Sequence, residues 1–378
     1  MASRASASWG EHLSEGFRAF TSLVKQRPYY NPAAGPIPKE MWSVQSVEKG
    51  KVALKKVPVP VPEAGEVLVR LQYTPVHPHD INYAMGFVNY GADEIEVPHS
   101  IGNEGSGVVV GSGGGLLAHY YCRSMTRVAA TSDKAQFWSE YAVASATQTL
   151  PLPDSLDSKK GAAAFVNPTA SLVILTLAYE GGHKALVISP ANSQVGLQTT
   201  RGAAYFGLKT VCIVRGEDRV RMLEKDVGVP REQIVRSDVD SFESDLRKAV
   251  ELTGATIAFD GIAGDVSSTI YKAMPKKADV YYYGNIGGGG VPKELEDKEN
   301  DPEKFFRLLH APKWVAESYL RKVKLYYRLS KLLEDKLYTD YAREISLEDK
   351  ELIDTIHSLG KEYKTGKVLI KMPAADSE

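Results

Sequence analysis

The chain has 378 residues, and 46 lysines and arginines against 47 aspartates and glutamates leave a formal net charge of -1. A nearly neutral chain lacks the cationic excess that releases counterions from a nucleic-acid backbone, which excludes general nucleic-acid binding. The sequence has no apolar run near the roughly 18 residues that a bilayer span needs, and two cysteines, Cys122 and Cys212, cannot form a disulfide framework or a structural zinc site. The length predicts two or three domains, and the low cysteine count fits a reducing compartment.

Residues 1–35 form a mildly basic extension whose pattern predicts an amphipathic helix. Its apolar side chains recur every three or four residues, at Trp9, Leu13, Phe17, Phe20 and Val24. Two interpretations follow: a mitochondrial targeting segment, or a helix that docks its apolar stripe on this protein or on a partner. The expected location is mitochondrial or cytoplasmic, and the extension favours mitochondrial.

The first large segment, from Trp42 to Leu150, consists of short β-type runs interrupted by Pro and Gly. The expected strands are 52–54, 66–73, 107–111, 127–131 and 138–144. This spacing is typical of a small antiparallel, barrel-like domain.

From Lys184 onward, apolar strands alternate with helices. Strands are expected at 185–189, 210–214, 234–236, 256–260 and 280–283, with helices at 195–206, from 218, at 242–252 and at 266–274. Strict alternation predicts a parallel, doubly wound sheet. A further strand is expected near 314–320, then a basic helix at 322–333, and finally a helix and a strand that ends near Ile370.

The segment 189–196 follows the first of these strands and precedes a helix, the position at which a dinucleotide pyrophosphate binds. Only Gly196 remains of the usual glycine pattern, so an ordinary strand-to-helix turn is the alternative. The acid expected about 20 residues later for NAD is replaced by Arg215. Arginine there favours the 2′-phosphate of NADP, although a solvated helix start with Glu217 and Asp218 also fits.

Five short blocks occur in the order found in a known superfamily: 75–82, 102–105, 138–141, 166–170 and 192–196. With them, residues 35–372 resemble the medium-chain dehydrogenases/reductases, in particular the zinc-independent quinone oxidoreductases and mitochondrial 2-enoyl thioester reductases. The resemblance implies an α/β fold with a GroES-like barrel-type domain, 36–166 and 335–378, and a Rossmann domain with a doubly wound parallel sheet, 167–334.

The zinc-dependent relatives require ligands that this chain lacks. Asn103 stands where they have a histidine, and the first block offers no cysteine. Asparagine is a poor zinc ligand, so no metal is expected. His77 and His79 are interpreted as strand-end or loop residues.

Without zinc, the resemblance implies hydride transfer from a nicotinamide to a quinone or an α,β-unsaturated carbonyl compound. The family's tyrosine acid corresponds to Tyr90, although two residues, Phe87 and Val88, interrupt the matching stretch, and a packing role for this tyrosine is the alternative. Asn82 is expected to orient the acceptor, and Trp138 to form an aromatic wall.

The resemblance also implies residues that contact NADPH: Thr169, Asn192, Ser193, Gln194, Val195, Gly196, Arg215 and Gly284. A helix N-cap is an equally compatible role for Thr169. Gln194 replaces a glycine, so its side chain must point away from the pyrophosphate.

Three functional hypotheses remain. The first is an NADPH-dependent reductase of quinones or conjugated carbonyl compounds. The second is a trans-2-enoyl-CoA/ACP reductase whose thioester would meet the basic helix around Lys322, although a solvated helix face is the alternative for these charges. The third is a non-catalytic relative within a larger, mitochondrial assembly, because the loop at Gln194 and the spacing at Tyr90 are altered. The expected partners are a small-molecule substrate and, by analogy, a second copy of the chain in a homodimer, or the subunits of such an assembly.

Overall fold

The computed structural model describes residues 28–85, 96–132, 134, 136–361 and 367–374. The predicted N-terminal helix and Tyr90 lie outside the described residues. The chain divides into two compact units, and each is described by itself. Unit 1 comprises Met1–Phe165 and Asp340–Glu378, and unit 2 comprises Val166–Thr339. Within the described ranges, no helix combines the length and the apolar composition needed to cross a membrane.

Unit 1 is built on two sheets that are antiparallel apart from one pair of strands. In the larger sheet the path is β16 (Tyr341–Ser346), β17 (Lys367–Lys371), β4 (Glu66–Pro75), β6 (Glu104–Ser112), β7 (Arg127–Thr131) and β9 (Thr149–Pro151). Off this path, β1 (Tyr29–Tyr30) pairs with β6 and β8 (Tyr141–Ser145) pairs with β4. The smaller sheet contains β3 (Lys51–Pro58), β2 (Glu40–Glu48) and β5 (His99–Ser100).

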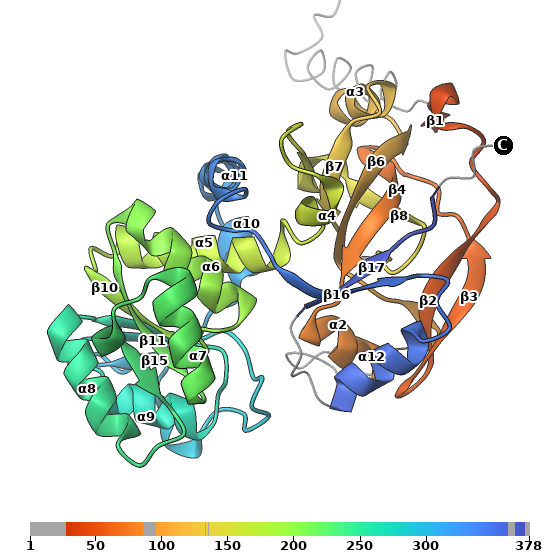
Figure 1. Cartoon of the computed structure of the whole chain (residues 1–378). Helices are drawn as coiled ribbons and strands as arrows, with labels where there is room; N and C mark the ends of the chain where they lie inside the picture. Colours follow the sequence, from red (N-terminus) through yellow and green to blue (C-terminus); the bar gives the residue numbers. More distant parts are fainter. Residues whose placement is uncertain (1–27, 86–95, 133, 135, 362–366, 375–378) are drawn as a thin grey trace, which may run out of the picture. The chain divides into compact units, whose positions relative to one another are not determined.

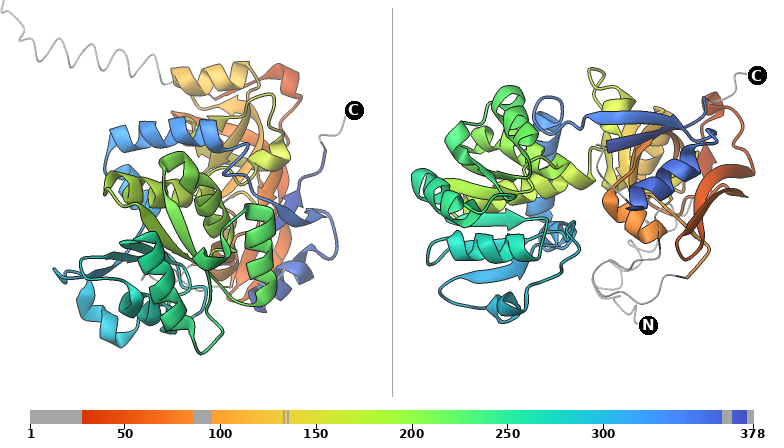
Figure 2. Two further views of the ribbon diagram at one scale, coloured as in Figure 1. Left: turned by 60° about the vertical axis from the view of Figure 1, so that its left-hand side comes forward. Right: turned by 60° about the horizontal axis from the view of Figure 1, so that its bottom comes forward.

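The α-helices described in unit 1 are α2 (Pro78–Ala84), α3 (Leu116–Arg123), α4 (Ser158–Gly161) and α12 (Leu352–Lys361). Helix α12 comes from the C-terminal part of the chain and packs beside α2 and β3 (Figure 2). Alternate residues of the strands point inward, and the buried core includes Val67, Val69 and Leu71 of β4. This alternation is the pattern that predicted an antiparallel barrel-type unit.

Unit 2 contains a six-stranded parallel sheet with the order β12-β11-β10-β13-β14-β15. Its strands are β12 (Ile234–Arg236), β11 (Lys209–Val214), β10 (Ala185–Ser189), β13 (Ile257–Asp260), β14 (Asp279–Tyr282) and β15 (Phe305–Leu308). The strand order reverses direction at β10, which is typical of dinucleotide-binding sheets. The predicted α/β class, with a barrel-type unit and a doubly wound parallel sheet, is confirmed.

The helices of unit 2 cover both faces of this sheet (Figure 1). They are α5 (Val166–Glu180), α6 (Gln194–Ala203), α7 (Glu217–Met222), α8 (Phe242–Thr253), α9 (Asp265–Ala273), α10 (Ala311–Ala316) and α11 (Tyr319–Leu332). On one face, α8 buries Leu246 and Val250 against Val187 and Ile213 of the central strands. Residues 335–339 also lie in unit 2, where the amide of Gln198 donates to the carbonyl oxygen of Leu337 at 2.8 Å.

The strand predicted near residues 314–320 is wrong. Helix α10 and the start of α11 occupy this segment, because Pro312 suits a first helical turn and the His310 side chain accepts a hydrogen bond from Lys313 N at 3.1 Å. The sixth strand is instead β15, which pairs with β14. Strand β14 therefore has a neighbour on each side, and β12 and β15 form the two edges of this sheet.

Candidate functional site

The turn between β10 and α6 is the most sharply defined feature of unit 2. Ser193 is the N-cap of α6, and its Oγ accepts a hydrogen bond from Gly196 N at 3.0 Å while donating to Pro190 O at 2.8 Å. A Cβ on residue 196 would lie 2.3 Å from Pro190 O. Only glycine allows the helix to start this close to the strand.

The first turn of α6 presents backbone donors without protein acceptors. Among the described residues, the amides of Gln194 and Val195 donate to no protein group, as expected at a helix N-terminus. The Oε1 atom of Gln194 is also buried and has no partner within the described ranges. The two backbone amides, unlike this side-chain oxygen, are donors that fit a pyrophosphate, which binds such amides with help from the helix dipole.

Two further loops meet this turn at the carboxyl edge of the sheet. The carbonyl oxygen of Ser189 accepts hydrogen bonds from Gly261 N at 2.6 Å and from the Tyr283 hydroxyl at 3.2 Å. A Cβ on Gly284 would lie 2.9 Å from Gly261 O, so these loops pack backbone against backbone. Burial, and then the charge of Asp260, raises the pKa of Tyr283, which therefore stays protonated and keeps its hydrogen bond.

Asp260 fixes the loop that follows β13. Its buried carboxylate accepts hydrogen bonds from Ile262 N at 3.0 Å, Ala263 N at 3.0 Å and Ser267 Oγ at 2.6 Å. Burial raises the pKa of Asp260, against the effect of these donors. Asp260 was not among the residues predicted from the sequence, although an acid that ends an apolar strand is typical of a loop anchor.

The predicted nucleotide residues take different places in this arrangement. Asn192, Ser193, Gln194 and Val195 are half-buried around the start of α6, and Gly196 is buried. Thr169 is the fourth residue of α5, so it is not the N-cap of that helix. Any contact of these residues with a nucleotide stays a prediction.

Arg215 directly follows β11 and is exposed, with no partner among the residues that the structure describes. The groups that follow Arg215 are less favourable to a phosphate than Arg215 itself, because they include carboxylates. The Gly216 amide donates to Asp238 Oδ1 at 3.1 Å, and Arg236 pairs with Asp238 at 2.9 Å and with Glu217 at 3.4 Å. Arg236, followed by that amide, holds the pKa of Asp238 well below its usual range, so the carboxylate is charged.

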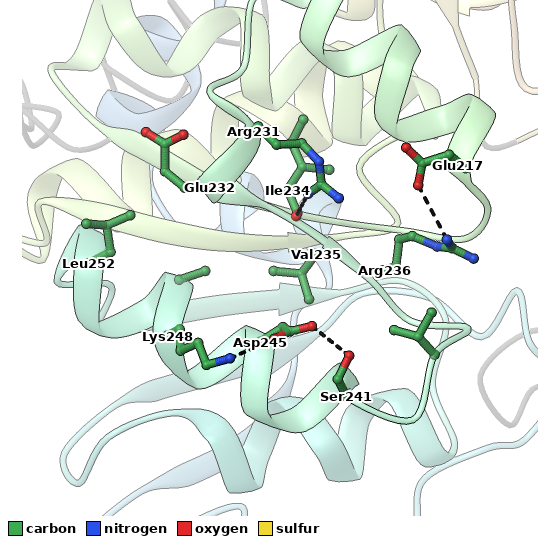
Figure 3. A pocket seen from close by; sticks show the side chains of 12 residues that line it. Glu217, Arg231, Glu232, Ile234, Val235, Arg236, Ser241, Asp245, Lys248 and Leu252 are labelled. Carbon is green, nitrogen blue, oxygen red and sulfur yellow. Dashed lines mark hydrogen bonds and ion pairs between the residues drawn. The ribbon is translucent and has the colours of Figure 1, made fainter.

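A hollow of about 430 Å³ lies along β12 and α8 of unit 2 (Figure 3). Its walls carry both signs of charge, and several of these groups bind one another. Lys248 pairs with Asp245 at 3.1 Å, and Arg231 donates to Ile234 O at 2.9 Å. Because several of the charged side chains in its walls already bind protein groups, the hollow shows no preference for one kind of ligand. The β10–α6 turn is not part of it.

In unit 1, the predicted acceptor residues differ in exposure. Asn82 is exposed on α2, whereas Trp138 is fully buried and its indole N–H donates to Pro75 O at 3.3 Å. Trp138 therefore belongs to the packed core of unit 1. Its predicted role as an aromatic wall stays untested, as does the role of Tyr90.

His77 has a structural setting that the sequence did not suggest. It is the N-cap of α2, and its Nε2 and Nδ1 lie 2.6 Å from Glu104 Oε1 and 2.6 Å from Lys367 Nζ respectively. His79 follows in the first turn of α2 and contacts the Asn103 side chain. Within the described part of the chain, no three His, Cys, Asp or Glu side chains are grouped as a metal site.

Comparisons with known proteins point to one group of enzymes, although no family model matches the chain. The mitochondrial enoyl-[acyl-carrier-protein] reductase of Caenorhabditis elegans is 26% identical over 62% of this chain and 66% of its own length. Prostaglandin reductase-3 of Mus musculus is 24% identical over 95% of this chain and 96% of its own length. The matched region thus covers just under two thirds of the enoyl reductase.

Solved structures share the fold. A putative NADPH:quinone reductase from Mesorhizobium loti superposes with a TM-score of 0.77 at 23% identity, covering 89% of this chain and 99% of that chain. A mycobacterial protein solved in complex with NADPH gives a TM-score of 0.71 at 20% identity, with 88% of this chain and 99% of that chain covered. The predicted resemblance to the zinc-independent medium-chain dehydrogenases/reductases is confirmed.

Proposed function

We propose that this protein is an NADPH-dependent reductase of quinones or α,β-unsaturated carbonyl compounds that works without zinc. The observation that carries the proposal is the β10–α6 turn, with its unused amides at Gln194 and Val195 and its close approach at Gly196. The reductase relatives and the NADPH-bound structural neighbour support the same conclusion.

In this proposal, unit 2 binds the nucleotide. The α6 N-terminus receives the pyrophosphate, Arg215 receives the 2′-phosphate, and Gly284 leaves room beside the turn. Thr169 and Asn192 make further contacts with the nucleotide. The bound nicotinamide supplies the hydride, which is the difficult chemical step.

Unit 1 serves the acceptor. Asn82, exposed on α2, orients it through its side-chain amide, and Tyr90 donates the proton that completes reduction of a conjugated carbonyl compound. Trp138 acts indirectly, from within the core, because its indole N–H donates to the carbonyl oxygen of Pro75. Pro75 is the last residue of β4 and lies two residues before the N-cap of α2.

A 2-enoyl thioester is the second candidate acceptor, because several curated relatives are mitochondrial enoyl-[acyl-carrier-protein] reductases. Their names also support a mitochondrial location, together with the amphipathic pattern predicted for the N-terminal extension. The basic side chains Arg321, Lys322 and Lys324 on α11 offer contacts for the phosphates of such a thioester.

Calorimetric titration with NADPH and NADH tests the proposal, with Arg215→Ala as the variant and Arg221→Ala, an exposed arginine of α7, as the control. Loss of a charge-assisted contact of about 1.5 to 3 kcal/mol should weaken NADPH binding about tenfold to a hundredfold. NADH binding and the control should be unchanged. If neither nucleotide binds at millimolar concentration, the reductase proposal fails and a non-catalytic role replaces it.

A further inference from the structure

Three titratable side chains meet in the interior of unit 1, far apart in the sequence. His77, Glu104 and Lys367 are 3%, 1% and 4% exposed. The proposed reduction does not use them, and no pattern in the sequence predicted that they would meet. Burial of three such groups is unfavourable unless each has a hydrogen-bond partner, so their mutual contacts are needed to keep them in the interior.

The three groups form a directional array. An ammonium can only donate, so Lys367 Nζ donates to His77 Nδ1 at 2.6 Å, and the imidazole carries its proton on Nε2. That proton is donated to Glu104 Oε1, also at 2.6 Å. Burial, followed by the Lys367 charge, lowers the pKa of His77, which agrees with a neutral imidazole in the middle of the array.

The array ties together four segments of the chain. His77 is the N-cap of α2, Glu104 is the first residue of β6, and Lys367 is the first residue of β17. Glu104 Oε2 also accepts a hydrogen bond from Phe165 N at 2.8 Å, at the residue where the chain leaves unit 1. The Glu104 carboxylate therefore binds both the N-cap residue of α2 and Phe165, the last residue of the first segment of unit 1.

Helix α2 depends on such an anchor. It has seven residues, too few to be stable in isolation. Its N-terminus is held by His77, whose backbone N–H donates to Asp80 Oδ2 at 3.0 Å. Asn82 is two residues further along and is exposed. Asn82 therefore lies on a short helix whose N-terminus is held by a residue of the array.

We infer that Lys367, His77 and Glu104 are positioning residues that hold α2, and with it Asn82, in the orientation that the acceptor requires. This inference rests on the proposed function, because it gives Asn82 the acceptor. The array itself is buried and touches neither acceptor nor nucleotide. Its polarity matters as much as its packing, since each group donates or accepts in one direction only.

The test uses variants that keep the shape but reverse or remove one hydrogen bond. Glu104→Gln places an amide N–H2 where two donors already point, and Lys367→Met removes the donor to His77. His77→Gln is the conservative variant, because a glutamine amide can accept from Lys367 and donate to Glu104. Val109→Ala, a buried position of β6 outside the array, controls for a general loss of stability.

The kinetic readout is the reduction of menadione by NADPH, or of crotonyl-CoA if only the thioester is reduced. We expect KM for the acceptor to rise about tenfold in Glu104→Gln and Lys367→Met, as misplaced substrate contacts do. The Kd of NADPH should stay within about twofold of wild type, because the nucleotide residues lie in unit 2. His77→Gln should restore KM relative to His77→Ala.

A second readout does not need activity. Hydrogen exchange of the amides in 79–84 should accelerate in Glu104→Gln and Lys367→Met, but not in Val109→Ala at equal loss of melting temperature. If α2 exchanges alike in all variants, or if KM follows melting temperature in Val109→Ala as well, the array is only structural and the inference is overturned. A wild-type chain that binds no NADPH refutes the proposed function, while the exchange experiment still decides whether the array anchors α2.

Discussion

The β10–α6 turn of unit 2 and the Lys367–His77–Glu104 array of unit 1 both fix the start of a helix, but by different means. The turn uses neighbouring residues and backbone contacts, with Gly196 against Pro190 O. The array uses titratable side chains, with Glu104 27 residues and Lys367 290 residues after His77. The turn should therefore respond to added volume, and the array to changes of polarity and protonation.

The largest effect is expected for Gly196→Ala. The new Cβ would lie 2.3 Å from Pro190 O and 2.6 Å from Ala191 Cα, and backbone atoms cannot yield as a flexible side chain can. We expect a loss of about 3 kcal/mol in the free energy of unfolding and loss of NADPH binding, measured by denaturant titration and calorimetry.

Gly202→Ala is the matched control in the same helix. Its Cβ would meet the ends of two side chains, Leu175 at 2.8 Å and Leu337 at 4.0 Å, and such side-chain ends can move aside. A change below about 1 kcal/mol is expected. Equal losses in the two variants would contradict a special role for the close approach at residue 196.

An intermediate effect is expected from pH at Lys367. Burial lowers the pKa of its ammonium to about 8 from 10.5, so between these values the unfolded chain binds more protons at this position than the folded chain. The free energy of unfolding should then rise with pH across this interval. The groups facing Lys367 are His77, Asp80, Glu104 and, on the paired strand, Tyr341.

The measurement is urea unfolding of wild type and Lys367→Met across that interval. Other lysines and tyrosines titrate in both chains, so the difference between the two isolates Lys367. Wild type should gain stability relative to the variant as pH rises. Parallel curves would show that the ammonium is not perturbed by burial.

The smallest effect is expected for Glu217→Gln, which sharpens the description of the nucleotide site. Glu217 is half-exposed and pairs with Arg236 at 3.4 Å, close to Arg215 in sequence. Removing one surface charge should improve NADPH affinity by about twofold at low salt. NADH affinity should not change. Glu232→Gln, just before the start of β12, is the control. An equal gain in affinity for NADPH and NADH in Glu217→Gln would argue against a 2′-phosphate beside Arg215.

Much of unit 2 was predictable because its signals are local. The apolar run 185–189 coincides with β10, since a strand buried on both faces is a continuous apolar run in the sequence. The error at 314–320 has a local cause as well. Its aromatic and β-branched residues favour a strand, but His310 and Pro312 start a helix there, and Leu325 and Leu329 of α11 are buried.

The candidate site was predictable only where one segment builds it. Residues 189–196 were found because a strand, a turn and a helix start follow one another. Asp260 and Tyr283 were missed as partners of that turn, since they come from other strands and meet Ser189 only in the folded sheet. The burial of Trp138 was equally hidden, because aromatic residues occur both in cores and at binding surfaces.

The sequence by itself determined the alternation of strands and helices, the barrel-type pattern before it, the nucleotide turn and the resemblance that follows from five short blocks. These depend on periodicity and on neighbours in the chain. Only the tertiary structure decided that Lys367, His77 and Glu104 share one buried array and that Asp238 and Arg236 stand beside the residues after β11. Contacts between distant side chains depend on strand order and register, which fix them only once the sheets have formed.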